Sequence, residues 1–313
     1  MNSTPPGAAV DVARLGLKGP RGWAFRDIDA AAEPGTLIAV EGPSGSGRTS
    51  LLLVLTGRMR PSTGHAATGR LPLTGGRRSG QERRMAAVRR ISALAHVPGV
   101  CELDPALTVA EHLREHALLQ RRFAGSLRAL LRPRRERAAE ARRRIDAALD
   151  AAGLDPAALP KQERTAVRDL ERLESLRLSI ALALIDAPRL LAVDDTDLKL
   201  SDTEREQAWD LLRTVAASGT TVLAVCSQAP PDALVIRTAR DRRPDSADGP
   251  RSGSGTGKDN GPAPEPAGTG SASGTGDSTD DDTPAEAAPA AASGTEDHDN
   301  EGTKDAFAET GRS

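Results

Sequence analysis

Residues 36–55 read TLIAVEGPSGSGRTSLLLVL, a glycine-rich loop between two apolar runs. The first run, residues 36–41, follows Pro34-Gly35 and is rich in β-forming side chains, which predicts a short buried strand. The second run, residues 51–55, predicts a helix. Strand, glycine-rich loop and helix in this order indicate a phosphate-binding loop, because the turning backbone points N–H groups at an anion and the helix start adds partial positive charge.

The loop between the two runs fits the pattern G-x-x-x-x-G-K-[ST], except that Arg48 stands in the lysine position. Arginine is longer than lysine, planar and forked, so we expect it to hold phosphate with an altered geometry. Thr49 is expected to place its hydroxyl on Mg²⁺. We therefore predict binding of a nucleoside triphosphate, while hydrolysis stays open. The residues expected to hold the phosphates are Gly42, Pro43, Ser44, Gly45, Ser46, Gly47, Arg48, Thr49 and Ser50.

A second strand that ends in carboxylates lies further along, where residues 189–195 read RLLAVDD. Together with the phosphate loop, this strand end resembles the ATP-binding cassette (ABC) ATPases, and the order of features from Val10 to Ala239 follows that family's nucleotide-binding domain. The resemblance implies that Asp194 holds Mg²⁺ through water. It places Asp195 where the family has a glutamate that orients the attacking water, so the shorter side chain predicts a weak catalytic carboxylate.

The segment before the acidic strand departs further from the family pattern. Residues 170–174 read LERLE and take the place of the signature LSGGQ, whose serine and glycines face a phosphate of the partner subunit. The alternative, which the pattern favours, is an amphipathic helix whose apolar face carries Leu170, Leu173, Leu176 and Ile180. After the acidic strand, Ser201 and Glu204 form a capping-box pattern that predicts a helix reaching about residue 217.

Two more positions of the family pattern are changed. Ser227, after a predicted strand at residues 220–225, falls where the family has its switch histidine. A serine can hydrogen-bond the terminal phosphate but cannot act as an imidazole. His96 stands near the glutamine of the family's Q-loop, with an ordinary surface histidine as the alternative. Trp23 is the nearest aromatic that could stack on adenine, but packing within a pair of strands is the favoured interpretation.

The predicted fold is α/β, a P-loop NTPase domain of the ABC type at residues 8–240, with a helical lobe at about 100–185. The resemblance implies the ATP-binding subunit of a transporter-like complex, with ATP and Mg²⁺ as cofactors. It also implies a dimer of ATP-binding domains and a transmembrane permease as partners. The altered residues predict slow or absent hydrolysis, so ATPase activity stays open. The alternative is a regulatory or adaptor subunit that senses nucleotide without turning it over.

Charge divides the chain near residue 244. Residues 245–313 hold 4 Lys+Arg and 15 Asp+Glu and have no Leu, Ile, Val, Met or Trp, so we expect a disordered acidic tail. The remainder holds 38 basic and 29 acidic residues. Only 2 cysteines and no signal-peptide pattern are present, which suits the cytoplasm. Contact with the inner face of the cell membrane would then come through a partner.

Two weaker patterns point to other classes of protein. Residues 112–116 read HLREH, which fits a zinc-peptidase motif, although a third ligand is not identifiable. Residues 121–144 contain ten arginines and could attract lipid headgroups or nucleic-acid phosphates. Because aromatic residues make up only 2% of the chain, a dedicated single-strand binder is not favoured. A nucleic-acid-associated P-loop protein remains a third alternative.

Overall fold

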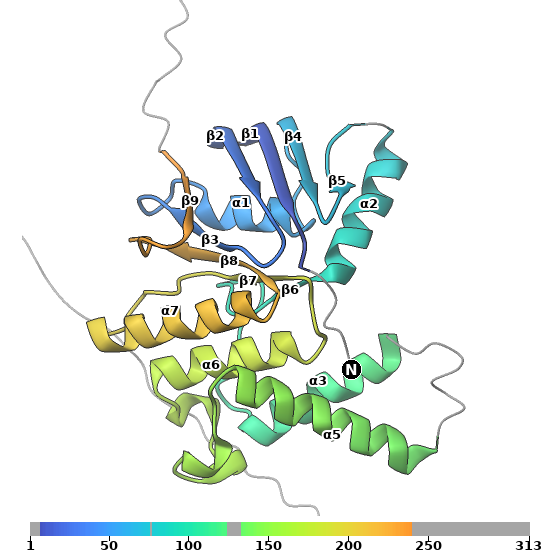
Figure 1. Cartoon of the computed structure of the whole chain (residues 1–313), viewed down its shortest axis with the longest axis vertical. Coiled ribbons are helices and arrows are strands. Elements are labelled where there is room, and N and C mark those ends of the chain that lie inside the picture. Colours follow the sequence, from blue (N-terminus) through green and yellow to red (C-terminus); the bar gives the residue numbers. More distant parts are fainter. Residues whose placement is uncertain (1–6, 76, 124–132, 240–313) are drawn as a thin grey trace, which may run out of the picture. The chain divides into compact units, whose positions relative to one another are not determined.

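The computed structural model describes residues 7–75, 77–123 and 133–239 (Figure 1). The predicted acidic tail at 245–313 lies outside the described residues. The same holds for residues 124–132 of the arginine-rich segment.

A five-stranded parallel sheet forms the centre, in the order β6-β7-β8-β3-β9. Its strands are β3 (Leu37–Glu41), β6 (Ser92–Leu94), β7 (Leu190–Val193), β8 (Thr221–Cys226) and β9 (Leu234–Arg237). The strands predicted at 36–41, 189–195 and 220–225 are therefore confirmed as β3, β7 and β8. All four residues of β7 and all six of β8 are buried, as expected of parallel strands covered on both faces.

A four-stranded antiparallel sheet, in the order β2-β1-β4-β5, lies on one side of the parallel sheet. It consists of β1 (Val10–Gly19), β2 (Gly22–Ala32), β4 (Thr63–Thr68) and β5 (Leu71–Pro72). Helix α1 (Arg48–Leu55) contacts strands of both sheets and lies between them, and α2 (Arg78–Ile91) flanks β5 (Figure 1). The predicted helix at 51–55 is thus the buried part of α1.

Four helices lie on the opposite side of the parallel sheet (Figure 1). They are α3 (Val109–Phe123), α5 (Arg134–Ala151), α6 (Arg172–Leu184) and α7 (Asp202–Ala217). Helices α6 and α7 contact the strands, while α3 and α5 pack against α6. Alternation along β3 explains the two cores, since Ile38 and Val40 pack toward α1 while Leu37 and Ala39 pack toward the helices. None of the described helices combines the length and the apolar character needed to cross a membrane.

The first residues of α7 and α6 can be compared with two predictions from the sequence. Ser201 is the N-cap of α7, where the Glu204 N–H donates to the Ser201 hydroxyl at 3.3 Å and the Ser201 N–H donates to the Glu204 carboxylate at 2.8 Å. The predicted capping box is therefore confirmed. Helix α6 begins only at Arg172, so Leu170 precedes the helix and does not share its apolar face, which corrects the prediction for that residue. Leu173, Leu176 and Ile180 are buried as predicted.

Trp23 packs within a pair of strands. It lies in β2 opposite Lys18 of β1, whose Nζ is 5.8 Å from the centre of the indole ring. This contact supports the packing interpretation over adenine stacking.

Candidate functional site

The predicted site residues lie at one edge of the parallel sheet, where the strands end. Glu41 of β3 pairs with Cys226 of β8, and Val193 of β7 pairs with Ala224 of β8. The residues that follow these strands, including Gly42, Asp194 and Ser227, are therefore brought to the same edge. In open α/β sheets this carboxyl edge is the usual place for ligands.

The phosphate loop, residues 42–47, is pressed closely against its neighbours. Gly47 has φ 84°, and a Cβ built on it would lie 2.3 Å from the carbonyl oxygen of Ala24 in β2. A Cβ on Gly42 would lie 2.4 Å from the Oγ1 of Thr238. A side chain cannot fit at either position, so glycine is what lets the loop backbone lie this close to its neighbours.

The start of α1 provides backbone donors beside the loop. The Leu51 N–H makes the first bond of the helix, to the carbonyl oxygen of Gly47 at 2.8 Å. The N–H groups of Arg48, Thr49 and Ser50 precede it, so they have no partner one helical turn earlier. Free N–H groups and the positive end of the helix dipole together favour an anion such as phosphate.

The side chains of the loop are not all turned toward such a ligand. Ser46 is fully buried, and its Oγ lies 2.6 Å from the Oγ1 of Thr238, so this hydroxyl ties the loop to the end of β9. Pro43, Ser44 and Gly45 are exposed, and Ser50 is half-buried in α1.

Thr49 and Asp194 meet across the edge. The Thr49 hydroxyl donates to Asp194 Oδ2 at 2.6 Å, and the Asp195 N–H donates to Asp194 Oδ1 at 2.9 Å. Asp194 is 1% exposed, and burial raises the pKa of its carboxyl, an effect to which the neighbouring Asp195 charge adds. A hydroxyl and a carboxylate are the hard oxygen donors that Mg²⁺ prefers, so this pair fits the predicted metal.

Asp195 and His96 lie beside this pair. Asp195 has φ 48°, a left-handed conformation that aspartate tolerates, and is half-buried. The carbonyl oxygen of His96 accepts the Asp194 N–H at 2.8 Å. Burial lowers the pKa of the His96 imidazole, and the Arg172 guanidinium lowers it further while Asp195 opposes the shift. The surroundings of His96 thus favour the neutral imidazole.

Arg48 reaches from the start of α1 to the end of β8. One of its guanidinium N–H groups, on Nη1, donates to the carbonyl oxygen of Cys226 at 2.5 Å. The cation is thus held between the phosphate loop and the neighbouring strand end.

Ser227, the predicted switch residue, is held by a residue that the sequence did not single out. The Ser227 N–H donates to Asp197 Oδ2 at 2.7 Å, and the Ser227 hydroxyl contacts the same oxygen. The two residues are 30 positions apart, and no local pattern links them. Only the pairing of β7 with β8 brings the loops that carry them together.

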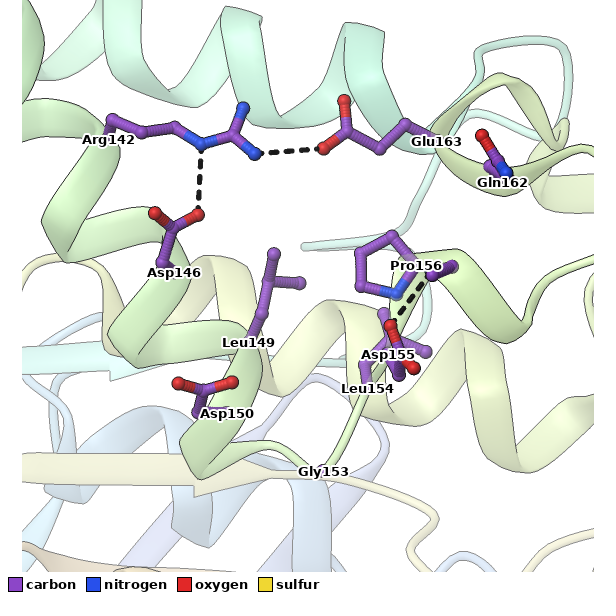
Figure 2. A pocket seen from close by; sticks show the side chains of 11 residues that line it. Arg142, Asp146, Leu149, Asp150, Gly153, Leu154, Asp155, Pro156, Gln162 and Glu163 are labelled. Atoms are coloured by element: carbon purple, nitrogen blue, oxygen red, sulfur yellow. Dashed lines mark hydrogen bonds and ion pairs between the residues drawn. The ribbon is translucent and has the colours of Figure 1, made fainter.

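A cavity of about 720 Å³ lies elsewhere, between α5 and the short helices η1 (Pro156–Ala158) and η2 (Gln162–Arg164) (Figure 2). Figure 2 shows Arg142 bridging its two walls, with Nε 3.0 Å from Asp146 and Nη2 3.3 Å from Glu163. None of the phosphate-loop residues lines this cavity. The nucleotide site predicted from the sequence is instead an open edge of the sheet.

The zinc-peptidase pattern in α3 does not assemble a metal site. His112 Nε2 lies 3.2 Å from the carbonyl oxygen of Asp104, and His116 Nε2 lies 3.4 Å from Asp186. Within residues 7–75, 77–123 and 133–239, no three His, Cys, Asp or Glu side chains are grouped so that they could hold a metal.

Comparison with known proteins gives consistent matches. The family model described as ABC transporter matches residues 25–197. Nod factor export ATP-binding protein I of Cupriavidus pinatubonensis (strain JMP 134 / LMG 1197) is 30% identical over 197 residues, which are 63% of this chain and 52% of that protein. ABC transporter G family member 5 of Arabidopsis thaliana is 28% identical over 65% of this chain and 28% of its own length. The chain therefore spans about half or less of these curated relatives.

Solved structures share the fold at low identity. The dimeric ATP-binding cassette MJ0796, in a post-hydrolysis state with ADP and Pi, has a TM-score of 0.53 and 19% identity, covering 70% of this chain and 88% of its own. The cbiO1 protein from Clostridium perfringens, part of the ABC transporter complex cbiONQ, has a TM-score of 0.56 and 18% identity, covering 75% and 88%. At sequence identities this low, the likeness shows a shared fold and nothing more.

Proposed function

The chain belongs to the ABC transporter family, and from this premise we propose that it is the ATP-binding subunit of a transporter complex, with slow or absent hydrolysis. The observation that carries the proposal is the 2.6 Å contact between Thr49 and Asp194 at the edge that also bears the phosphate loop. Mg²⁺ is usually bound through one or two carboxylates together with substrate phosphates. The Thr49 hydroxyl at the start of α1 and the buried Asp194 carboxylate therefore fit a metal ion that also contacts a bound phosphate.

Each part of the edge has a role in binding. The N–H groups at the start of α1 would hold the phosphates, and Arg48 would balance their charge. Thr49 and Asp194 would hold Mg²⁺, which when bound neutralises negative charge on the phosphates. The loop can keep this conformation because Gly42 and Gly47 have no Cβ to clash with Thr238 and Ala24.

Slow turnover follows from two side chains, Asp195 and Ser227. Asp195 is one methylene shorter than glutamate, so its carboxylate reaches less far toward an attacking water. Ser227 cannot act as an imidazole, and its hydroxyl contacts Asp197. These features also support the second candidate, a nucleotide-sensing subunit that binds ATP without hydrolysing it.

We expect Arg48→Ala to lower the affinity for Mg-ATP by about tenfold or more, because a charge-assisted contact to phosphate is lost. Arg48→Lys should keep most of the affinity, since lysine keeps the cation. Titration calorimetry on the full chain measures both. Arg60→Ala is the matched control, because Arg60 lies beyond the far end of α1, where it pairs with Glu82. No binding by the unmodified chain would refute the proposed function.

We expect Asp195→Glu to raise the rate of ATP hydrolysis, by up to about 100-fold, because the longer side chain brings its carboxylate closer to the attacking water. Phosphate release at saturating Mg-ATP measures the effect, and Asp195→Asn serves as the control without a base. If Asp195→Glu binds ATP but releases no phosphate, the sensor candidate is preferred.

Partners are proposed from the relatives. The MJ0796 structure is dimeric and cbiO1 is part of a transporter complex, so we propose a second ATP-binding domain and a membrane permease as partners. The permease would hold this subunit at the inner face of the cell membrane. Nucleic acid is not favoured as a partner, because arginines of α5 are engaged with acidic neighbours, as Arg143 and Arg144 are with Glu140.

A further inference from the structure

We propose that Asp197 determines how strongly the site distinguishes ATP from ADP, by holding the proton of the Ser227 hydroxyl. This inference rests on the nucleotide binding proposed above. It concerns a residue that has no part in the predicted phosphate or metal contacts.

The contact between the two loops is extensive. Asp197 Oδ2 accepts the Ser227 N–H at 2.7 Å and the Gln228 N–H at 3.4 Å, besides its contact with the Ser227 hydroxyl. The neighbouring Thr196 donates its N–H and its hydroxyl to the carbonyl oxygen of Val225, at 3.1 and 2.8 Å. Successive residues of the loop after β7 are therefore bonded to β8 and to the loop that follows it, which fixes the orientation of Ser227.

Ser227 lies next to the proposed phosphate site. It follows Cys226, which pairs with Glu41, the residue that precedes the phosphate loop. The carbonyl oxygen of Cys226 also accepts a hydrogen bond from the Arg48 guanidinium. Burial, with the charges of Asp197 and Glu41, raises the pKa of the Cys226 thiol to about 12, and the Arg48 charge opposes this rise. The charges of Asp197 and Arg48 therefore both act at this strand end.

The chemistry of Ser227 and Asp197 decides which of them donates the hydrogen bond between their side chains. An ionised carboxylate only accepts hydrogen bonds, so the Ser227 hydroxyl must donate to Asp197. The remaining side of the hydroxyl oxygen then offers lone pairs, which cannot bind an anionic phosphate oxygen. Asp197 also adds a negative charge beside the site. Both effects disfavour the terminal phosphate, which ATP has and ADP lacks.

The test compares the affinities for Mg-ATP and Mg-ADP of the full chain and of Asp197→Asn. Asparagine has nearly the same shape, but its amide N–H can donate to the Ser227 oxygen. The hydroxyl proton is then free to turn toward a phosphate. We expect the ratio of ATP to ADP affinity to rise about tenfold, as for one hydrogen bond to a charged group. Asp150→Asn, at the end of α5, is the matched control and should leave the ratio unchanged.

A double-mutant cycle with Ser227→Ala separates the hydroxyl from the charge. Asp197→Asn should raise the ratio much less when Ser227 is replaced. An unchanged ratio in Asp197→Asn, with nucleotide still bound, would overturn the inference and leave the proposed function intact. An equal rise with and without Ser227 would overturn the role of the hydroxyl proton. Failure of every variant and the unmodified chain to bind either nucleotide would overturn the proposed function, and the inference with it.

Discussion

Gly47→Ala is expected to lower the free energy of unfolding by about 3 kcal/mol and to abolish nucleotide binding. The backbone at Gly47 has φ 84°, which costs any residue with a Cβ. The added Cβ would also lie 2.3 Å from the carbonyl oxygen of Ala24 and 3.3 Å from Phe25 Cδ1. Ala24 is fixed within β2, so the phosphate loop must move instead. Urea unfolding and Mg-ATP titration measure the two losses.

Gly153→Ala is the control that separates the steric clash from the backbone cost. Gly153 has φ 60°, and a Cβ built on it meets nothing within 4 Å. This variant should lose only about 1 kcal/mol and bind nucleotide normally. Equal losses of stability in the two variants would show that the contact with Ala24 is not a barrier.

Asp194→Asn is expected to weaken Mg-ATP binding by about 10–100-fold, because a neutral amide holds the hydrated metal less well. Affinity measured with EDTA should change little, since only the metal-dependent part is lost. Calorimetric titrations with and without Mg²⁺ separate the two. Equal loss in both conditions would mean that Asp194 supports the loop rather than the metal.

The same variant is expected to stabilise the ligand-free protein at pH 7. Burial raises the pKa of Asp194 above its ordinary value of 3.8. At a pH between the ordinary pKa of the unfolded chain and the raised pKa of the folded protein, the folded state therefore binds more protons than the unfolded state. The free energy of unfolding therefore falls as pH rises through that window, and the deficit persists at pH 7. Asparagine has no such deficit, and its advantage should vanish below the ordinary pKa.

Urea unfolding between pH 3 and pH 7 tests this expectation. Asp11→Asn is the control, because Asp11 is exposed on β1. A destabilised Asp194→Asn at pH 7 would indicate that its two hydrogen bonds outweigh the cost of the buried charge.

Local signals in the sequence were enough for much of the fold and part of the site. The phosphate loop, the acidic strand end and the capping box of α7 each depend on residues that are close in the chain, and all three form where the pattern predicts. The prediction that Leu170 lies on the apolar face of α6 is wrong because the spacing of apolar residues along a helix does not show where the helix begins. The helix instead starts where Glu174 Oε2 accepts the Glu171 N–H at 2.9 Å.

The remaining features depend on contacts between distant residues. Ser46 meets Thr238 across 192 positions, and Arg48 meets Cys226 across 178. No propensity or spacing rule contains such pairs, because they arise from the order of the strands in the sheet. Local patterns in the sequence therefore indicate the residues at this edge of the sheet, but they do not predict which of these residues are hydrogen-bonded to one another.

The environment of Cys226 makes the site tolerant of oxidants. Oxidation and alkylation proceed through the thiolate. Because burial raises the pKa of the Cys226 thiol to about 12, almost none of it is ionised at pH 7. The strand end that anchors Arg48 should therefore keep its shape under peroxide or disulfide stress that would modify an ordinary exposed cysteine.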